Sequence, residues 1–367
     1  MRKGLPVLML ILCLWLSGCT AWMDGSYSSV RPHTERNQQS DDQTVSVGTY
    51  LELRDALIEM VEGSGETMLL NVSQMDAEQL SEDMQQAVEY VMYSNPVGAY
   101  AVEAITYEQG TSGGQNALSV TVTYNHNRSD IRAMKHAQNM DDVKMIVADV
   151  LEQCESRVVL LTEAYEVIDI PQFVADYADN NPSMIMETPQ VTVNMYPEQG
   201  TERVLEIVFS YQSSRESLRS MQSRVRPLFT SAELYVIGNH ADYEKYDQLY
   251  SFLMERHEYT VETSITPSYS LLIHGVGDSK AFATVFAAMC RRAGLECMVV
   301  SGTREGEPLF WNIIRDGDIY LHVDLLRCSR EGSFGQWYDD EMTGYVWDYS
   351  AYPECTAPEP PAYEESE

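Results

Sequence analysis

A short sequence pattern that occurs twice constrains the fold of this chain more than any other feature. Residues 124–134 (YNHNRSDIRAM) and 211–221 (YQSSRESLRSM) share the pattern Y-x-x-x-R-x-x-[IL]-R-x-M. Each copy follows two strand-like runs that are joined by a loop containing Glu-Gln-Gly, at 101–107 and 117–124 and again at 190–196 and 204–211. Runs of this kind around a turn signal predict β-hairpins. We therefore expect a duplicated α+β region of β-hairpin and helix units over about residues 46–232.

The flanking segments show helical spacing of apolar residues, which predicts helices at 50–62, 77–92, 140–154 and 214–226. The repeated pattern places arginines at equivalent positions in its two copies, namely Arg128, Arg132, Arg215 and Arg219. They are compatible with a ligand site or with solvated charges near the N-terminus of a helix. We favour the second interpretation, so this region predicts no chemistry.

The N-terminus has the anatomy of a secretory signal peptide. Arg2 and Lys3 precede an apolar run over residues 5–16, which is too short to cross a bilayer of ~30 Å. The run ends in residues 16–19 (LSGC), which resemble the bacterial lipobox. This resemblance implies that residues 1–18 are cleaved off and that Cys19 carries lipid, so the membrane is one partner and the protein lies outside the cytoplasm, anchored to a bacterial membrane. An ordinary signal peptide beside an incidental cysteine is the alternative.

Both ends of the mature chain lack hydrophobic periodicity. Residues 19–45 are polar and predict a flexible tether, and residues 353–367 predict an unstructured acidic, Pro-rich tail. The net charge of −32 argues against a nucleic-acid partner, because no basic stripe is present to displace phosphate counterions. The same charge suits either attraction of cationic peptides or simple solubility. We favour solubility.

The cysteines give little support for a metal site or a cofactor. The chain has seven, and five remain once Cys13 leaves with the signal peptide and Cys19 takes lipid. An odd number cannot all pair, and no CxxC or Cys/His spacing suggests a metal site, so neither metal nor cofactor is expected. A disulfide between Cys328 and Cys355 is compatible with an oxidising compartment.

The C-terminal third predicts a compact arrangement of helices and strands. Its expected elements are a helix over 243–258, a second helix that begins at Asp278 or Ser279 and ends before Gly294, a strand over 297–300 and a hairpin around residues 316–317 (DG). If those two residues form the loop, Trp311 lies opposite His322 and Leu309 lies opposite Asp324.

Residues 268–324 contain three motifs: Tyr269, Leu272 and Gly275 in the spacing Tyr–x–x–Leu–x–x–Gly, residues 309–312 (LFWN) and residues 322–324 (HVD). Together they resemble the core of the transglutaminase-like superfamily, whose papain-like members use a Cys–His–Asp triad. The first motif matches the run that leads to the nucleophile, the second stands where the family has His-Ala-Trp-Asn, and the third stands for its acidic strand. The resemblance implies a transglutaminase-like domain of papain-like fold over residues 233–352. Its triad positions are Ser279, Leu309 and Asp324.

Two of these three positions depart from the triad. A serine hydroxyl at a helix N-terminus still needs an adjacent base, and Leu309 cannot accept a proton. Asp324 keeps its place but has no imidazole to orient. We therefore expect Ser279 to cap its helix and Leu309 to fill the former site. Removing a triad member typically costs several orders of magnitude in rate.

Two functions follow from these residues. We favour a catalytically inactive lipoprotein that acts in binding or scaffolding at the cell envelope, with an unidentified protein or peptide as its partner. The alternative is a hydrolase or acyltransferase acting on envelope peptides through Ser279, with His322 in a rearranged site as its base.

Overall fold

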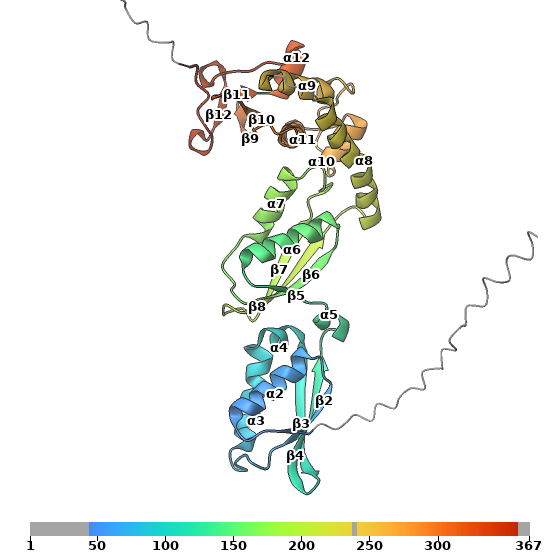
Figure 1. The fold of residues 1–367 in the computed structure, drawn as a ribbon, viewed down its shortest axis with the longest axis vertical. Helices are drawn as coiled ribbons and strands as arrows, with labels where there is room; N and C mark the ends of the chain where they lie inside the picture. The colour runs from blue at the N-terminus through green and yellow to red at the C-terminus, as the bar shows by residue number, and fades with distance from the viewer. Residues whose placement is uncertain (1–43, 237–240, 359–367) are drawn as a thin grey trace, which may run out of the picture.

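The computed structural model describes residues 44–236 and 241–358, which form three bodies arranged in a row (Figure 1). Each body has its own four-stranded sheet. Cys19, nearly all of the expected tether and the last nine residues lie outside the described residues, so lipid attachment stays a prediction. No helix in the described part of the chain combines the length and the apolar character needed to cross a membrane.

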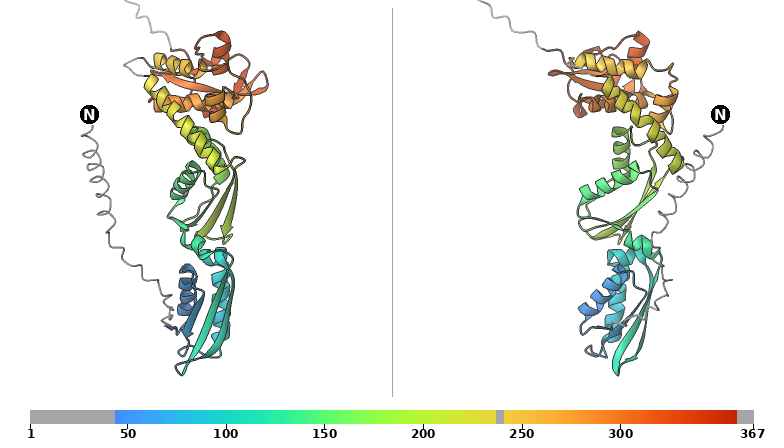
Figure 2. Two further views of the ribbon diagram at one scale, coloured as in Figure 1. Left: turned by 90° about the vertical axis from the view of Figure 1, so that its right-hand side faces the viewer. Right: turned by 45° about the vertical axis from the view of Figure 1, so that its right-hand side comes forward.

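The first body is a sheet with helices on one face. Its elements are β1 (Val45–Ser46), α2 (Tyr50–Glu62), β2 (Thr67–Asn71), α3 (Leu80–Tyr93), α4 (Pro96–Ala101), β3 (Val102–Ser112) and β4 (Gln115–Tyr124). The strands lie in the order β1-β2-β4-β3, with β1 parallel to β2 and the other pairs antiparallel. Along β4, Leu118, Val120 and Val122 are buried while the residues between them are exposed. This alternation matches a sheet that is covered on one side only (Figure 2).

The second body repeats this arrangement. After α5 (Arg128–Arg132) come β5 (Lys135–Ala137), α6 (Met140–Glu152), β6 (Arg157–Thr162), α7 (Ile170–Asn180), β7 (Gln190–Tyr196) and β8 (Arg203–Ser210). The strand order is β5-β6-β8-β7, and again only the first pair is parallel. Both predicted hairpins are confirmed as β3–β4 and β7–β8. The strands β2 and β6, which extend each hairpin into a sheet, were not predicted.

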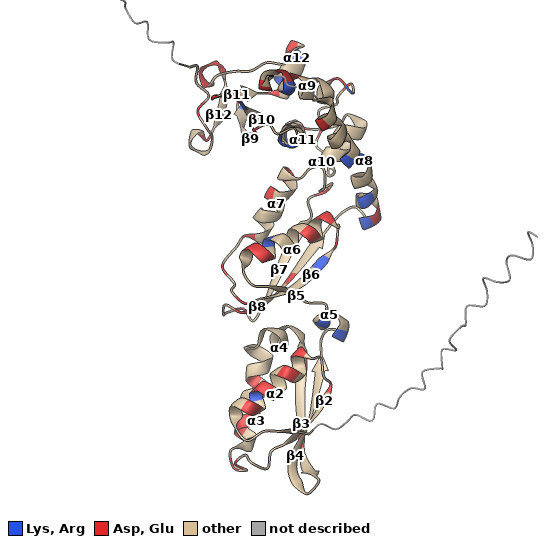
Figure 3. Cartoon of the chain, in the orientation of Figure 1, with Lys and Arg blue, Asp and Glu red and all other residues tan. Residues whose placement is uncertain are grey.

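The two copies of the repeated pattern lie at equivalent places in these bodies. Tyr124 ends β4 and Arg128 begins α5, while Tyr211 directly follows β8 and Arg215 begins α8 (Arg215–Tyr235). Arg128 forms an ion pair with Glu66, and Arg215 lies 2.5 Å from Glu155. These arginines are at least two-fifths exposed, which agrees with solvated surface charges. Acidic and basic residues are interspersed over all three bodies (Figure 3).

The third body begins with the C-terminal part of α8, and its other elements pack around the central helix α11. Its other elements are α9 (Asp242–Met254), α10 (Pro267–Tyr269), η1 (Ser270–His274), α11 (Ser279–Arg292), β9 (Cys297–Arg304), β10 (Glu307–Asp316), β11 (Ile319–Val323), α12 (Leu325–Glu331), η2 (Asp339–Glu341), β12 (Tyr345–Trp347) and η3 (Tyr349–Ala351). The antiparallel sheet has the order β11-β10-β9-β12. Residues 281–290 of α11 are all buried, because the helix packs against the sheet as well as against α8 and α9.

The predicted register of the β10–β11 hairpin is wrong by two residues. Asp316 pairs with Ile319, so the loop consists of Gly317 and Asp318, and His322 lies opposite Ile313 rather than Trp311. Gly317 has a φ of +60°, which glycine adopts without steric cost as the first residue of a two-residue hairpin loop. Leu309 lies beyond the paired part of β11 and does not face Asp324 across the hairpin.

The disulfide between Cys328 and Cys355, which the sequence left as a possibility, is not formed in the structure. All five cysteines of the described residues are buried with free thiols. The Cys328 sulfur contacts the backbone N–H and carbonyl of Gly335, whereas Cys355 lies beside Asp339. The two thiols therefore have separate environments.

Candidate active site

Ser279 is the first residue of α11, but it does not cap the helix. The cap is Asp278, whose carboxylate accepts a hydrogen bond from the backbone N–H of Ala281 at 2.9 Å. The hydroxyl oxygen of Ser279 accepts a hydrogen bond from the backbone N–H of Phe310 at 3.2 Å. This contact ties the start of α11 to β10. Among residues 44–236 and 241–358, Ser279 has no hydrogen bond to a titratable side chain.

Asp324 is buried and fully occupied by structural contacts. Its Oδ1 accepts hydrogen bonds from the backbone N–H groups of Leu326 at 3.0 Å and Arg327 at 3.1 Å, so it caps α12. Its Oδ2 accepts from the hydroxyl of Tyr345 at 2.7 Å, and Arg304 lies 3.7 Å from the same oxygen. Burial, reinforced by the charge of Asp324, raises the pKa of Tyr345 well above its ordinary value, so the phenol stays protonated as a donor.

His322 is fully buried, and both of its ring nitrogens are engaged. Nδ1 accepts a hydrogen bond from the indole N–H of Trp311 at 2.9 Å. The neutral ring must then carry its proton on Nε2, which donates to Asp339 at 2.8 Å. Burial lowers the pKa of His322, while Asp339 opposes that shift. The structure therefore does not bring the imidazole to Ser279, as a catalytic base would require.

His322, Asp339 and Cys355 lie close enough to be considered as metal ligands, with donor atoms within 4.8 Å of one another. A metal at Nε2 requires the lone pair of that nitrogen, but a neutral imidazole has only one, and the N–H of Trp311 already uses it at Nδ1. Burial, together with the nearby Asp339, also raises the pKa of the Cys355 thiol to about 12, although a ligand must be a thiolate. These residues do not suit a metal. Asp339 instead holds the C-terminal segment: its backbone N–H donates to the carbonyl of Cys355, and its carboxylate accepts from the backbone N–H of Cys355.

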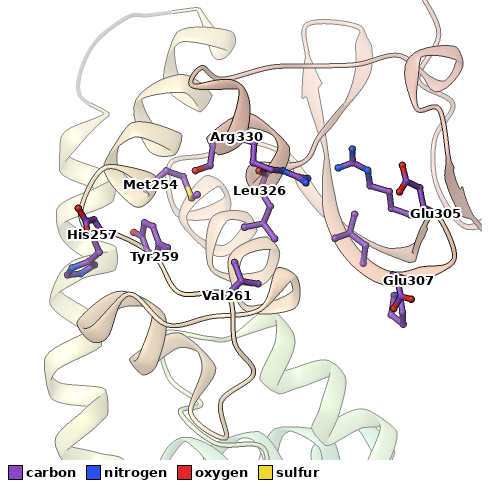
Figure 4. Close-up of a pocket in the computed structure, with 13 residues that line it drawn as sticks. Met254, His257, Tyr259, Val261, Glu305, Glu307, Leu326 and Arg330 are labelled. Atoms are coloured by element: carbon purple, nitrogen blue, oxygen red, sulfur yellow. Dashed lines mark hydrogen bonds between the residues drawn. The ribbon is translucent and has the colours of Figure 1, made fainter.

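The three triad positions line two different spaces. Ser279 and Asp324 line a narrow space that has no room for a water molecule. Leu309 instead lines an adjacent open pocket of about 740 Å³, and Leu326 lines both spaces. Figure 4 shows that this pocket collects side chains from separate segments, including Met254, Tyr259, Val261, Glu305, Glu307, Leu326 and Arg330.

Comparison with known proteins identifies this part of the chain. Residues 232–359 match the family model described as the transglutaminase-like superfamily. The third body is a transglutaminase-like domain. A search of curated proteins found no match.

Two solved structures are similar to this chain. One is described as a TGase; it is 10% identical, with 59% of this chain and 63% of that chain covered and a TM-score of 0.26. The other is described as a "putative protease" from Parabacteroides distasonis; it is 9% identical, with 70% of this chain and 40% of that chain covered and a TM-score of 0.22. The chain thus spans less than two thirds of each of these proteins.

Several residues of the transglutaminase-like domain that determine the chemistry of the site were missed by sequence reasoning. Tyr345 donates a hydrogen bond to the carboxylate of Asp324, and Asp339 accepts one from the imidazole of His322. Arg304 lies beside Asp324. Tyr345 and Asp339 follow their partners by 21 and 17 residues, with no periodic signal to link them. Trp311 was expected to contact His322, and it does so as a hydrogen-bonded diagonal neighbour rather than as a directly opposed pair.

Proposed function

We propose that the transglutaminase-like domain is catalytically inactive and acts in binding or scaffolding at the cell envelope, as part of a lipoprotein held on the outer side of a bacterial membrane through Cys19. One observation carries the loss of catalysis: the imidazole of His322 is committed to Trp311 and Asp339. A serine nucleophile needs a base within about 2.6–3.2 Å of its hydroxyl. The hydroxyl of Ser279 is bonded instead to a backbone N–H.

The pocket beside Leu309 supports a binding role. Its volume of about 740 Å³ lies within the range of typical ligand pockets, roughly 300–1,000 Å³. Leucine at the position of the base adds hydrocarbon to the pocket, so the change that removes catalysis also makes the pocket more suitable for an apolar group. The domain can therefore lack a catalytic base and still bind a ligand in this pocket.

Catalysis is tested with the mature chain, ester and peptide substrates, and a primary amine as acyl acceptor. We expect no turnover above that of Ser279→Ala, because the hydroxyl has no base. Ser301→Ala, which changes an exposed serine of β9, is the matched control. Turnover that Ser279→Ala abolishes and Ser301→Ala preserves would refute this proposal and favour a hydrolase or acyltransferase.

Membrane attachment is tested separately with Cys19→Ala in the bacterial host. We expect the parent protein in the membrane fraction with a lipid-modified N-terminal Cys19, since two or three acyl chains give stable anchoring. The variant is expected in the soluble extracytoplasmic or secreted fraction, or as an uncleaved precursor. An unmodified Cys19 in the membrane-bound parent would contradict the anchor but leave the binding role open.

A further inference from the structure

The pocket beside Leu309 has an apolar wall built from several segments. Figure 4 shows Met254 at the end of α9, Tyr259 and Val261 in the following loop, and Leu326 on α12 around the same space. Pro308 and Leu309 of β10 also line it. Val261 is exposed even though it is apolar. A wall of this composition favours a ligand that carries at least one apolar side chain.

The same pocket contains two guanidinium groups with unused hydrogen-bond donors. Arg304 at the end of β9 has its Nη1 buried without a hydrogen-bond partner. The oxygen of Asp324 that lies 3.7 Å away is too distant for a hydrogen bond and already accepts from Tyr345. Arg330 of α12 uses its Nε to bond the carbonyl of Leu326, and its terminal nitrogens have no partner among the described residues. The Nη1 of Arg304 is closed off from the pocket and keeps its ion pair with Asp324, so an acceptor supplied by a ligand would bond the other nitrogens of Arg304, whose side chain is 29% exposed, and the terminal nitrogens of Arg330.

The charges of the lining restrict what that acceptor can be. Guanidinium groups match the two oxygens of a carboxylate, with which they form paired hydrogen bonds. Glu258, Glu305 and Glu307 line the same pocket and disfavour a ligand with many negative charges, such as a phosphate polymer. The lining therefore suits a single carboxylate next to an apolar group.

We propose, on the basis of the binding function above, that this pocket takes the C-terminal end of a peptide. The terminal carboxylate lies at Arg304 and Arg330, and the last side chain, which is apolar, packs against Leu309 and Leu326. No bond is made or broken. The chemistry of recognition is a charge-assisted hydrogen bond to the carboxylate together with burial of the apolar side chain.

The test uses calorimetric titration of the mature chain, carrying Cys19→Ser, with three probes. N-acetyl-leucyl-leucine carries both the terminal carboxylate and the apolar side chains. The same dipeptide with a C-terminal amide lacks the charge, and N-acetyl-glycyl-glycine lacks the apolar side chains. We expect the leucyl acid to bind roughly tenfold or more tightly than either of the other two, since only it makes both interactions. Equal binding of acid and amide would overturn the assignment of the arginines, and binding of none of the probes would overturn the peptide ligand.

Variants locate the site. Arg330→Gln changes a solvent-exposed residue, so we expect it to fold normally and to reduce the preference for acid over amide. Arg304→Gln is expected to remove that preference, with thermal melting as the check on folding. Arg315→Gln, on the distant end of β10 where it pairs with Glu296, is the matched control and should bind like the parent. An unchanged preference in Arg330→Gln and in folded Arg304→Gln would refute the proposal. A Ser279-dependent turnover would instead refute the inactive-enzyme proposal, whatever the preference.

Discussion

Replacing Asp324 with alanine removes three hydrogen-bond contacts at once, because the buried carboxylate caps α12 and also accepts from Tyr345. In an active triad this acid would orient an imidazole. In this domain its contacts are with α12 and with the residue that begins β12. We therefore expect Asp324→Ala to lower the stability of the transglutaminase-like domain.

The size of this effect follows from the contacts. Loss of a helix N-cap typically costs about 1 kcal/mol. The hydroxyl of Tyr345 would be left buried without its acceptor, which costs about 1–3 kcal/mol. The Nη1 of Arg304, which is buried 3.7 Å from the carboxylate, also loses its ion-pair partner, and this adds to the cost. The free energy of unfolding should therefore fall by at least about 2–4 kcal/mol.

Tryptophan fluorescence during urea unfolding measures this domain selectively. Within the described residues all three tryptophans, Trp311, Trp337 and Trp347, belong to the third body, and Trp22 lies in the expected tether. The fluorescence transition therefore reports on the C-terminal domain rather than on the first two bodies. This separation matters because a chain of several domains need not unfold in a single step.

A double-mutant cycle with Tyr345→Phe tests the reasoning. In that background no hydroxyl is left without a partner, so Asp324→Ala should cost only the cap, about 1 kcal/mol, and the ion pair with Arg304, which is lost in both backgrounds. The difference between the two backgrounds should then be about 1–3 kcal/mol. Equal costs in both backgrounds would refute the structural role assigned to the Asp324–Tyr345 contact.

Three further perturbations test other parts of the domain. Burial lowers the pKa of His322 below 6.5, so the unfolded chain binds a proton at this residue more readily than the folded chain does. The urea midpoint of the parent should therefore decrease as the pH falls below about 6.5. The same decrease in His322→Gln as in the parent would contradict this. Trp311→Phe removes the donor to His322 and should cost about 1–3 kcal/mol by thermal melting followed by circular dichroism, whereas an unchanged melting temperature would argue against that hydrogen bond. Gly302→Ala places a methyl carbon 2.3 Å from the carbonyl oxygen of Val346 and should destabilise by about 1–3 kcal/mol, while Gly110→Ala, with nothing within 4 Å, serves as its control.

Local patterns in the sequence predicted α2, α3, α6, α8 and both hairpins of the first two bodies, because each depends on residues that are close in the chain, whereas α4, α5 and α7 were not predicted. The predicted β10–β11 register failed for a specific reason. A shift of two residues leaves every side chain on the same face of the sheet, so the apolar pattern of Ile313 and Ile314 cannot distinguish the two registers. Contacts outside the hairpin, such as the hydrogen bonds from Asn312 to the carbonyls of Ala283 and Met298, accompany the observed register.

The sequence by itself determined which functional groups stand at the triad positions: a hydroxyl at residue 279, a hydrocarbon at 309 and a carboxylate at 324. Only the tertiary structure decided what those groups and His322 contact. A buried imidazole or carboxylate bonds to whichever donors and acceptors the fold brings within about 3 Å. For His322 and Asp324 these include Asp339 and Tyr345, which lie in segments well separated from them along the chain.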